Sequence, residues 1–96
     1  MNLAREYAGS MSDNQILIDF YGADWCGDCR RTKRLLDELQ VPYRHHDVEH
    51  DPAAQQRAVE ISGVQSIPVV LFEDGSYFVE PSDPQMRDKL TELGLI

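Results

Sequence analysis

The sequence predicts one α/β domain, in which four strands form a mixed sheet with helices on both faces, in the order β-α-β-α-β-β-α. Two observations predict this fold class. Short apolar runs rich in β-branched residues alternate with segments of helical periodicity, which is typical of strand–helix–strand units. The last two strand candidates are separated only by turn-forming residues, which indicates an antiparallel hairpin.

The first half of the chain contains one strong strand candidate, one helix and one weaker strand. Residues 15–21 form a short, β-rich apolar run. About residues 26–39, apolar positions recur at helical spacing, and Val41–Pro42 ends this helix. Residues 43–48 are a weaker candidate, because two adjacent histidines interrupt the pattern. A crossover helix between these strands predicts that they are parallel.

The second half carries clear start and stop signals. Asp51–Pro52 combines an N-cap with proline at the first helical position, and Gly63 suits the left-handed residue beyond the helix end. Residues 69–72 and 77–79 are the two strands of the hairpin. A second cap followed by proline, at Ser82, predicts the last helix.

Length and charge limit the classes of function. Ninety-six residues suit a single domain, with residues 1–13 as a flexible N-terminal extension and residues 14–96 as the folded part. The net charge of −8 disfavours nucleic acid as a partner. No apolar run approaches the roughly 20 residues that span a bilayer, and the N-terminus lacks a signal-peptide pattern. We therefore expect a cytoplasmic protein that binds no membrane, and we expect a monomer.

Both cysteines of the chain lie in one motif, Cys26-Gly-Asp-Cys29, where the first helix is expected to begin. A sulfur at a helix N-terminus faces unpaired backbone N–H groups and the positive end of the helix dipole, and both favour the thiolate. Cys29 lies about one turn further along and is shielded from solvent. This geometry predicts that Cys26 attacks a disulfide and that Cys29 resolves the mixed disulfide.

Two other interpretations of the cysteines fit the sequence less well. They could be buried structural residues, but the Gly-Asp pair between them makes a poor core. A zinc site needs four ligands, whereas His45, His46 and His50 lie on a different segment and are expected at the surface. We therefore expect no metal.

The strand–CxxC–helix order resembles the thioredoxin-fold dithiol proteins, and within them the glutaredoxins. The segments "FYGADWCGDC", "SIP" at residues 66–68 and "FEDGS" resemble that family's active site, its Thr-Val-Pro type segment and its last hairpin. The branch that the chain most resembles is the actinobacterial mycoredoxins, through Trp25 and the runs "DVEHDPAA" and "FEDGSYFVEPS". The resemblance covers about residues 15–94. It implies a thioredoxin-like (glutaredoxin) fold and a thiol–disulfide oxidoreductase.

The resemblance also implies which residues contact substrate. Pro68 would follow a cis peptide bond and lie against the dithiol. The backbone of Ile67 would pair with an extended thiol peptide like one more strand. The expected catalytic residues are Cys26 and Cys29, and the expected substrate-binding residues are Trp25, Gly27, Asp28, Arg30, Ser66, Ile67, Pro68, Ser82 and Asp83.

Three roles stay open at this point. Trp25 either packs in the core or shields the dithiol and contacts substrate. The basic residues Arg30, Arg31, Lys33 and Arg34 either form a solvated helix face or bind a carboxylate of the substrate. Asp19 invites comparison with a buried proton-relay acid, although its spacing from Cys26 is one residue too long.

The expected electron donor is a small thiol, with no bound cofactor. Residues 79–83 stand where glutathione-using glutaredoxins usually carry a Gly-Gly-x-Asp segment, whereas mycoredoxins share the Pro-Ser found here. The resemblance thus implies mycothiol, with glutathione as the other candidate, and disulfide-containing proteins as substrates. Two alternative functions remain: a thioredoxin-like reductase recharged by an NADPH-dependent flavoenzyme, and an iron–sulfur carrier joining two chains through Cys26.

Overall fold

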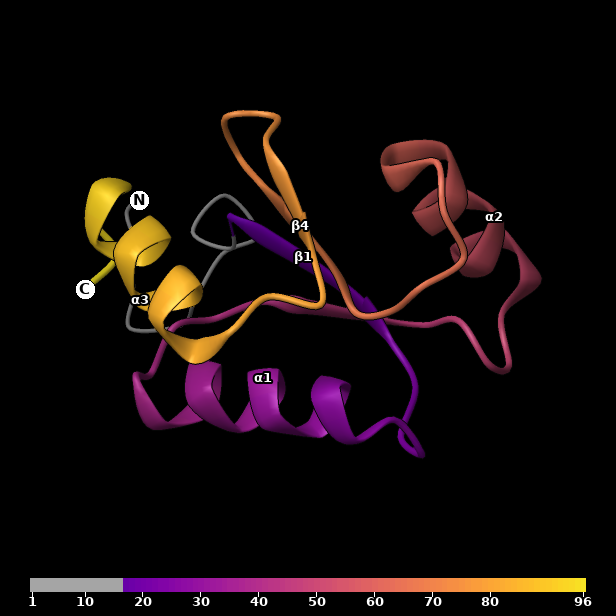
Figure 1. Ribbon diagram of the computed structural model, residues 1–96, viewed down its shortest axis with the longest axis horizontal. Coiled ribbons are helices and arrows are strands. Elements are labelled where there is room, and N and C mark those ends of the chain that lie inside the picture. Colours follow the sequence, from indigo (N-terminus) through magenta and orange to yellow (C-terminus); the bar gives the residue numbers. More distant parts are fainter. Residues whose placement is uncertain (1–16) are drawn as a thin grey trace, which may run out of the picture.

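The computed structural model describes residues 17–96, and the predicted order of elements is confirmed within that range (Figure 1). The expected extension, residues 1–13, lies outside the described residues and stays a prediction. The strands are β1 (Ile18–Gly22), β2 (Arg44–Asp47), β3 (Val69–Phe72) and β4 (Tyr77–Val79), and the helices are α1 (Gly27–Glu38), α2 (Pro52–Ser62) and α3 (Asp83–Glu92).

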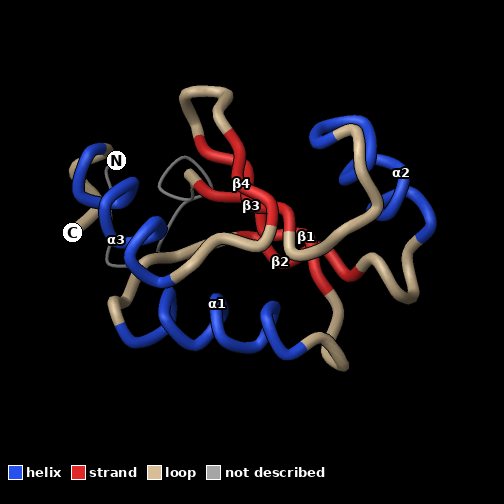
Figure 2. The backbone as a smooth tube through the Cα atoms, viewed as in Figure 1, coloured by secondary structure: helices blue, strands red, loops and turns tan. Residues whose placement is uncertain are grey.

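The four strands form one mixed sheet in the order β2-β1-β3-β4 (Figure 2). β1 pairs in parallel with β2 and antiparallel with β3, and β3 pairs antiparallel with β4. The parallel first pair and the terminal hairpin are both as predicted. β2 is shorter than the predicted run over 43–48, and its two histidines lie at or near the surface.

Helices cover both faces of the sheet (Figure 1). Alternate residues of a strand point to opposite faces, so each face presents its own apolar side chains to the helices that cover it. Ile18 and Phe20 of β1 pack with α1 and α3 in one buried cluster. Tyr21 packs with Ala54 and Ala58 of α2 in a second cluster on the other face. Tyr21 therefore belongs to the core beside α2.

The predicted helix signals are present as side-chain contacts. Asp51 caps α2 by accepting a hydrogen bond from the Ala53 N–H at 3.1 Å, and Gly63 follows the helix with a left-handed φ of 77°. Ser82 caps α3 and exchanges reciprocal hydrogen bonds with Gln85, which is a capping box. None of the helices within residues 17–96 is long and apolar enough to cross a membrane.

Lys89 ties α3 to the tip of the β3–β4 hairpin. Its side chain is only 10% exposed, and its Nζ lies 2.8 Å from Asp74 Oδ2 and 3.3 Å from Glu92 Oε2. The ammonium also lies 5.6 Å from the centre of the Phe72 ring. The hydrogen bond from Lys89, followed by those from Ser76, holds the pKa of Asp74 well below its ordinary value of 3.8.

Asp74→Asn is expected to lower the melting temperature at neutral pH and to matter less in acid. Because the folded-state pKa of Asp74 is depressed, its carboxylate stabilises the fold above the ordinary value of 3.8, and this contribution is lost as the pH falls below that value. Thermal unfolding at about pH 7 and about pH 2.5 measures the difference. Asp88→Asn, which changes an exposed acid on α3 next to Lys89, is the control. A melting-temperature difference that is the same at both pH values would contradict this account.

Candidate active site

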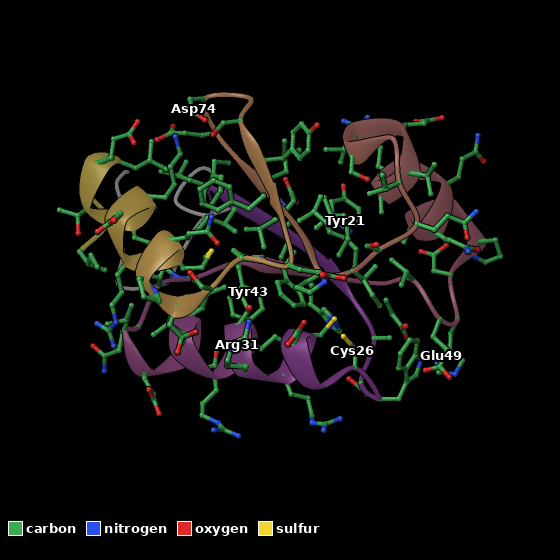
Figure 3. All side chains as sticks on the ribbon, viewed as in Figure 1. Tyr21, Cys26, Arg31, Tyr43, Glu49 and Asp74 are labelled. Carbon is green, nitrogen blue, oxygen red and sulfur yellow. The ribbon has the colours of Figure 1, made fainter. Side chains whose placement is uncertain are left out.

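Cys26 is the N-cap residue of α1, directly after the turn that leaves β1 (Figure 3). Its backbone is extended, and its Sγ accepts a hydrogen bond from the Cys29 N–H at 3.3 Å. The thiol also points toward the Ile67 carbonyl oxygen, 4.0 Å away. The sulfur is partly exposed, so a substrate can reach it while the helix terminus offers it an N–H donor.

Cys29 lies fully buried beneath Cys26, in the cluster formed by β1, α1 and α3. Burial, and next its hydrogen bond with Cys26, raises the pKa of the Cys29 thiol to about 12. Gly22 approaches it so closely that a Cβ at Gly22 would lie 2.9 Å from Cys29 Sγ. The two cysteines therefore differ in solvent access, and the buried Cys29 thiol is harder to ionise than an ordinary cysteine, as expected of a resolving cysteine.

The segment before β3 forms the wall opposite the dithiol. The Ile67–Pro68 peptide bond is cis, as the family resemblance implied. Pro68 is buried, and its carbonyl oxygen accepts a hydrogen bond from the Glu80 N–H at 2.9 Å. This bond joins the wall to the connection between β4 and α3.

A groove, defined here as two adjoining pockets, runs past Cys26. The first pocket, of about 520 Å³, is lined by Trp25, Cys26, Gly27, Asp28, Gln65, Ser66, Ile67 and Glu80. The second, of about 300 Å³, shares Trp25, Gln65, Ser66 and Ile67 with the first and adds Val48, Glu49, Gln55, Ala58, Val59 and Val64.

Trp25 stands between these two pockets and is 65% exposed. The interpretation of Trp25 as a core residue is therefore wrong, and its ring forms part of the groove. Pattern analysis did not single out Gln65 and Glu80, which also line the groove. The only available signal was that Gln65 precedes the Ser-Ile-Pro segment and that Glu80 begins the Glu-Pro-Ser segment.

Arg31 connects the start of α1 to the start of α3 (Figure 3). Its guanidinium donates to Asp28 Oδ1 at 2.8 Å and to the Pro81 carbonyl at 2.9 Å, and its Nε lies 3.4 Å from Asp83 Oδ1. Arg31 thus links Asp28 and Asp83, although Arg31 was not among the expected substrate-binding residues. Ser82 uses its hydroxyl to cap α3.

Arg30 and Lys33 of the basic cluster contact Asp24, which does not line the groove. Arg30 donates to the Asp24 carbonyl oxygen at 2.8 Å, and Lys33 lies 3.8 Å from an Asp24 carboxylate oxygen. Within the part of the chain that the structure describes, no lysine, arginine or histidine lines either pocket. The charged groove residues are all acidic.

Asp19 lies on the α2 face of the sheet, away from the dithiol face. Its Oδ1 is 2.9 Å from His46 Nε2 and 3.1 Å from Arg44 Nε, and the His46 ring stacks on Tyr21. Burial opposes ionisation, but the hydrogen bonds from His46 and Arg44 keep the pKa of Asp19 below its ordinary value. Asp19 is therefore not placed to relay protons to Cys29.

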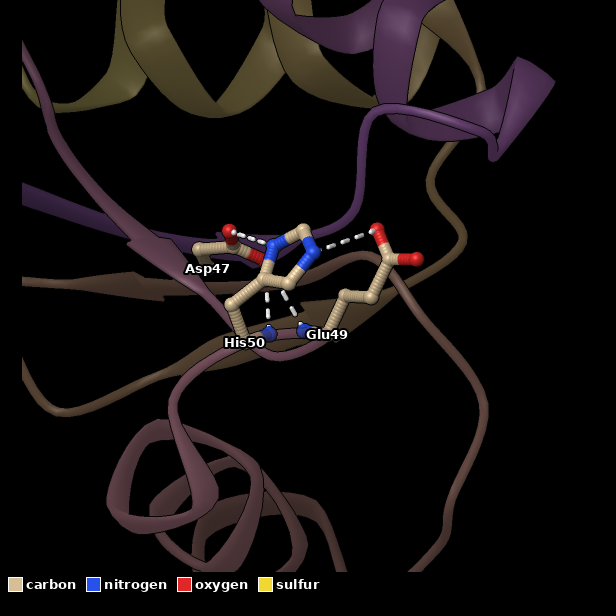
Figure 4. Close-up of side chains that lie close together, drawn as sticks. All are labelled: Asp47, Glu49 and His50. Carbon is tan, nitrogen blue, oxygen red and sulfur yellow. Dashed lines mark hydrogen bonds and ion pairs between the residues drawn. The ribbon is translucent and has the colours of Figure 1, made fainter.

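His50 belongs to a turn between β2 and α2, together with Asp47 and Glu49 (Figure 4). Asp47 Oδ1 accepts hydrogen bonds from the backbone N–H groups of Glu49 and His50, and Oδ2 lies 2.7 Å from His50 Nδ1. The hydrogen bond to Asp47 raises the pKa of His50. These contacts stabilise the turn.

A thioredoxin-like fold with one partly exposed and one buried cysteine at a helix start defines a thiol–disulfide oxidoreductase. The Glutaredoxin family model matches residues 18–78, well over half of the chain. The chain belongs to the glutaredoxin family.

The individual relatives include both glutaredoxins and thioredoxins. A predicted glutaredoxin of Mycobacterium tuberculosis is 32% identical over 77 residues, which cover 79% of this chain and 92% of that protein. Thioredoxin of Chlamydia trachomatis is 32% identical over 89 residues, which cover 91% of this chain and 86% of that protein. The crystal structure of a glutaredoxin from Archaeoglobus fulgidus superposes with a TM-score of 0.68 at 19% identity, covering 84% of this chain and 96% of that one. The mycobacterial relative fits the actinobacterial branch expected from the sequence.

Proposed function

We propose that this protein reduces disulfides of proteins, and mixed disulfides between proteins and a small thiol, with Cys26 as the nucleophile and Cys29 as the resolving cysteine. The observation that carries the proposal is the asymmetry of the pair. Cys26 Sγ is partly exposed and accepts the Cys29 N–H, whereas Cys29 is buried and has a raised pKa. A reducing cytoplasm, where such dithiols stay reduced, is the proposed compartment.

The reaction consists of two thiol–disulfide exchanges. The Cys26 thiolate attacks one sulfur of the substrate, a bond forms between the two sulfurs, and the other substrate sulfur leaves as a thiolate. Cys29 then gives up its proton and attacks Cys26 Sγ, so the Cys26–Cys29 disulfide forms and the second substrate sulfur leaves. Two electrons pass from the dithiol to the substrate, and the two leaving thiolates take up two protons.

Recharging reverses these steps with two molecules of a small thiol. The first attacks Cys26 Sγ, frees Cys29 and forms a mixed disulfide, and the second releases Cys26 and the disulfide of the small thiol. We propose mycothiol as this donor, because the described groove lining offers three acidic side chains and no basic one. Glutathione has two carboxylates and one ammonium, so it is a net anion that such a lining would repel, whereas the sugar and inositol parts of mycothiol are uncharged.

The test supplies one mixed-disulfide substrate with mycothiol, with glutathione, or with NADPH and a thioredoxin reductase. Turnover is expected to be fastest with mycothiol. Cys29→Ser should keep activity on mixed disulfides of the small thiol and lose the reduction of protein disulfides, because only the latter needs the resolving cysteine. Cys26→Ser should lose both.

A thioredoxin-like reductase is the second candidate, and the 32% identity with a chlamydial thioredoxin over most of the chain favours it. The same experiment separates the two functions. Turnover that is sustained by the flavoenzyme and by neither small thiol would replace the proposed function with this one.

A further inference from the structure

The groove carries an uncompensated negative charge next to the reactive sulfur. Asp28 and Glu80 line the pocket that contains Cys26. Asp28 is paired with Arg31 at 2.8 Å, so its charge is largely offset. Glu80 is exposed, and among residues 17–96 its carboxylate has no ion-pair or hydrogen-bond partner.

The backbone holds Glu80 at this place. Its N–H donates to the Pro68 carbonyl oxygen at 2.9 Å, and this bond holds Glu80 beside the segment that forms the wall opposite Cys26. Its φ is 51°, in the left-handed region that residues with a Cβ rarely adopt. Glycine would occupy this position with less strain, so the presence of a carboxylate here points to a use for its charge.

The other end of the groove has more apolar than polar lining residues. Val48, Ala58, Val59 and Val64 line the second pocket beside Trp25, and Val64 is itself 45% exposed. Such a pocket suits a bulky apolar side chain, whose burial there would remove Val64 and Trp25 from water. Glu49 is the only charged residue among the described lining residues of this pocket.

We propose that Glu80 is a specificity residue, which selects polypeptide disulfides with a Lys or Arg beside the reacting cysteine and a bulky apolar residue on its other side. This inference rests on the proposed function and names its substrate class. The occupant of the groove is a disulfide-bonded segment of another protein that carries local positive charge. The net charge of −8 attracts such segments at longer range.

The test measures the first exchange step alone, on the reduced protein. Peptides carry one cysteine activated as the 2-thiopyridyl disulfide, a Leu on one side and a Lys, Ser or Glu on the other, in both orders. The Cys26 thiolate bonds to the peptide sulfur, and pyridine-2-thione leaves and is followed by absorbance. The Lys peptide is expected to react about tenfold faster than the Glu peptide at low ionic strength, and the ratio should fall in high salt.

The charge of Glu80 is then removed. Glu80→Gln should reduce the Lys-to-Glu rate ratio to about a third of its original value or less. Glu73→Gln, which removes the same charge from the exposed hairpin turn, should leave the ratio unchanged. Both variants change the net charge equally, so a difference between them reports the position of the carboxylate.

The outcomes separate this inference from the proposed function. Equal rates for the three peptides, or a ratio that Glu73→Gln lowers as much as Glu80→Gln does, would overturn the role of Glu80 while the exchange chemistry stands. Rates no faster than those of a free cysteine in solution, for every peptide, would overturn the proposed function itself.

Discussion

The native, reduced protein is expected to react with iodoacetamide at neutral pH at one sulfur only, Cys26. The thiolate is the nucleophile, and burial, followed by the hydrogen bond with Cys26, raises the pKa of Cys29 from 9.0 to about 12. A thiol with such a raised pKa carries very little thiolate at neutral pH. Full burial further blocks the reagent from Cys29 Sγ, whereas Cys26 Sγ is partly exposed.

Mass spectrometry of the alkylated protein measures this difference. One adduct should form rapidly in the native state, and a second should appear only in denaturant. Cys26→Ala provides the matched control, because burial, the largest cause of the raised Cys29 pKa, persists in that variant. Its single thiol should react slowly when folded and at an ordinary rate when unfolded. Two native adducts forming at similar rates would remove the basis for assigning different roles to the two cysteines.

Gly22→Ala is expected to destabilise the fold and to slow the closure of the Cys26–Cys29 disulfide. The added Cβ would lie 2.7 Å from Phe20 Cε1 and 2.9 Å from Cys29 Sγ, both in fully buried side chains. Since neither atom can move freely in a packed core, we expect a loss of about 1–3 kcal/mol in the free energy of unfolding. Displacement of Cys29 would also misalign its attack on Cys26 Sγ.

Urea unfolding measures the stability, and the rate of intramolecular disulfide formation after mixing with an oxidised small thiol measures the second effect. Gly27→Ala is the control for stability. The nearest atom to a Cβ at Gly27 is Arg30 Nη2, 4.0 Å away, so this substitution makes only an ordinary van der Waals contact. If Gly22→Ala were as stable as Gly27→Ala and closed its disulfide at the original rate, the close approach of Gly22 to Cys29 would matter neither for stability nor for disulfide formation.

The fold could be predicted from the sequence because its signals are local. The Asp51 and Ser82 caps, the left-handed Gly63 and the hairpin turn each act within a few residues, and all are present in the structure. The dithiol could also be predicted from the sequence, because the start of a helix fixes how far each of two cysteines three residues apart is exposed to solvent.

The groove could not be predicted in the same way. Arg31 contacts the carbonyl of Pro81, fifty positions further along the chain, and this contact depends on how α1 and α3 meet. Glu80 reaches the Cys26 pocket only because its N–H is bonded to Pro68. Such contacts follow from tertiary packing, so a single sequence gives no pattern for them.

The central position of β1 has a consequence for how the chain matures. This strand leads into the dithiol helix, yet it sits between β2 and β3, and β3 emerges from the ribosome only after α2 is complete. Long-range pairing of this kind is slow to form. During synthesis, both thiols therefore emerge well before β3, the strand that completes the sheet beside them. An oxidant present at that stage could react with both cysteines, because Cys29 is not yet buried.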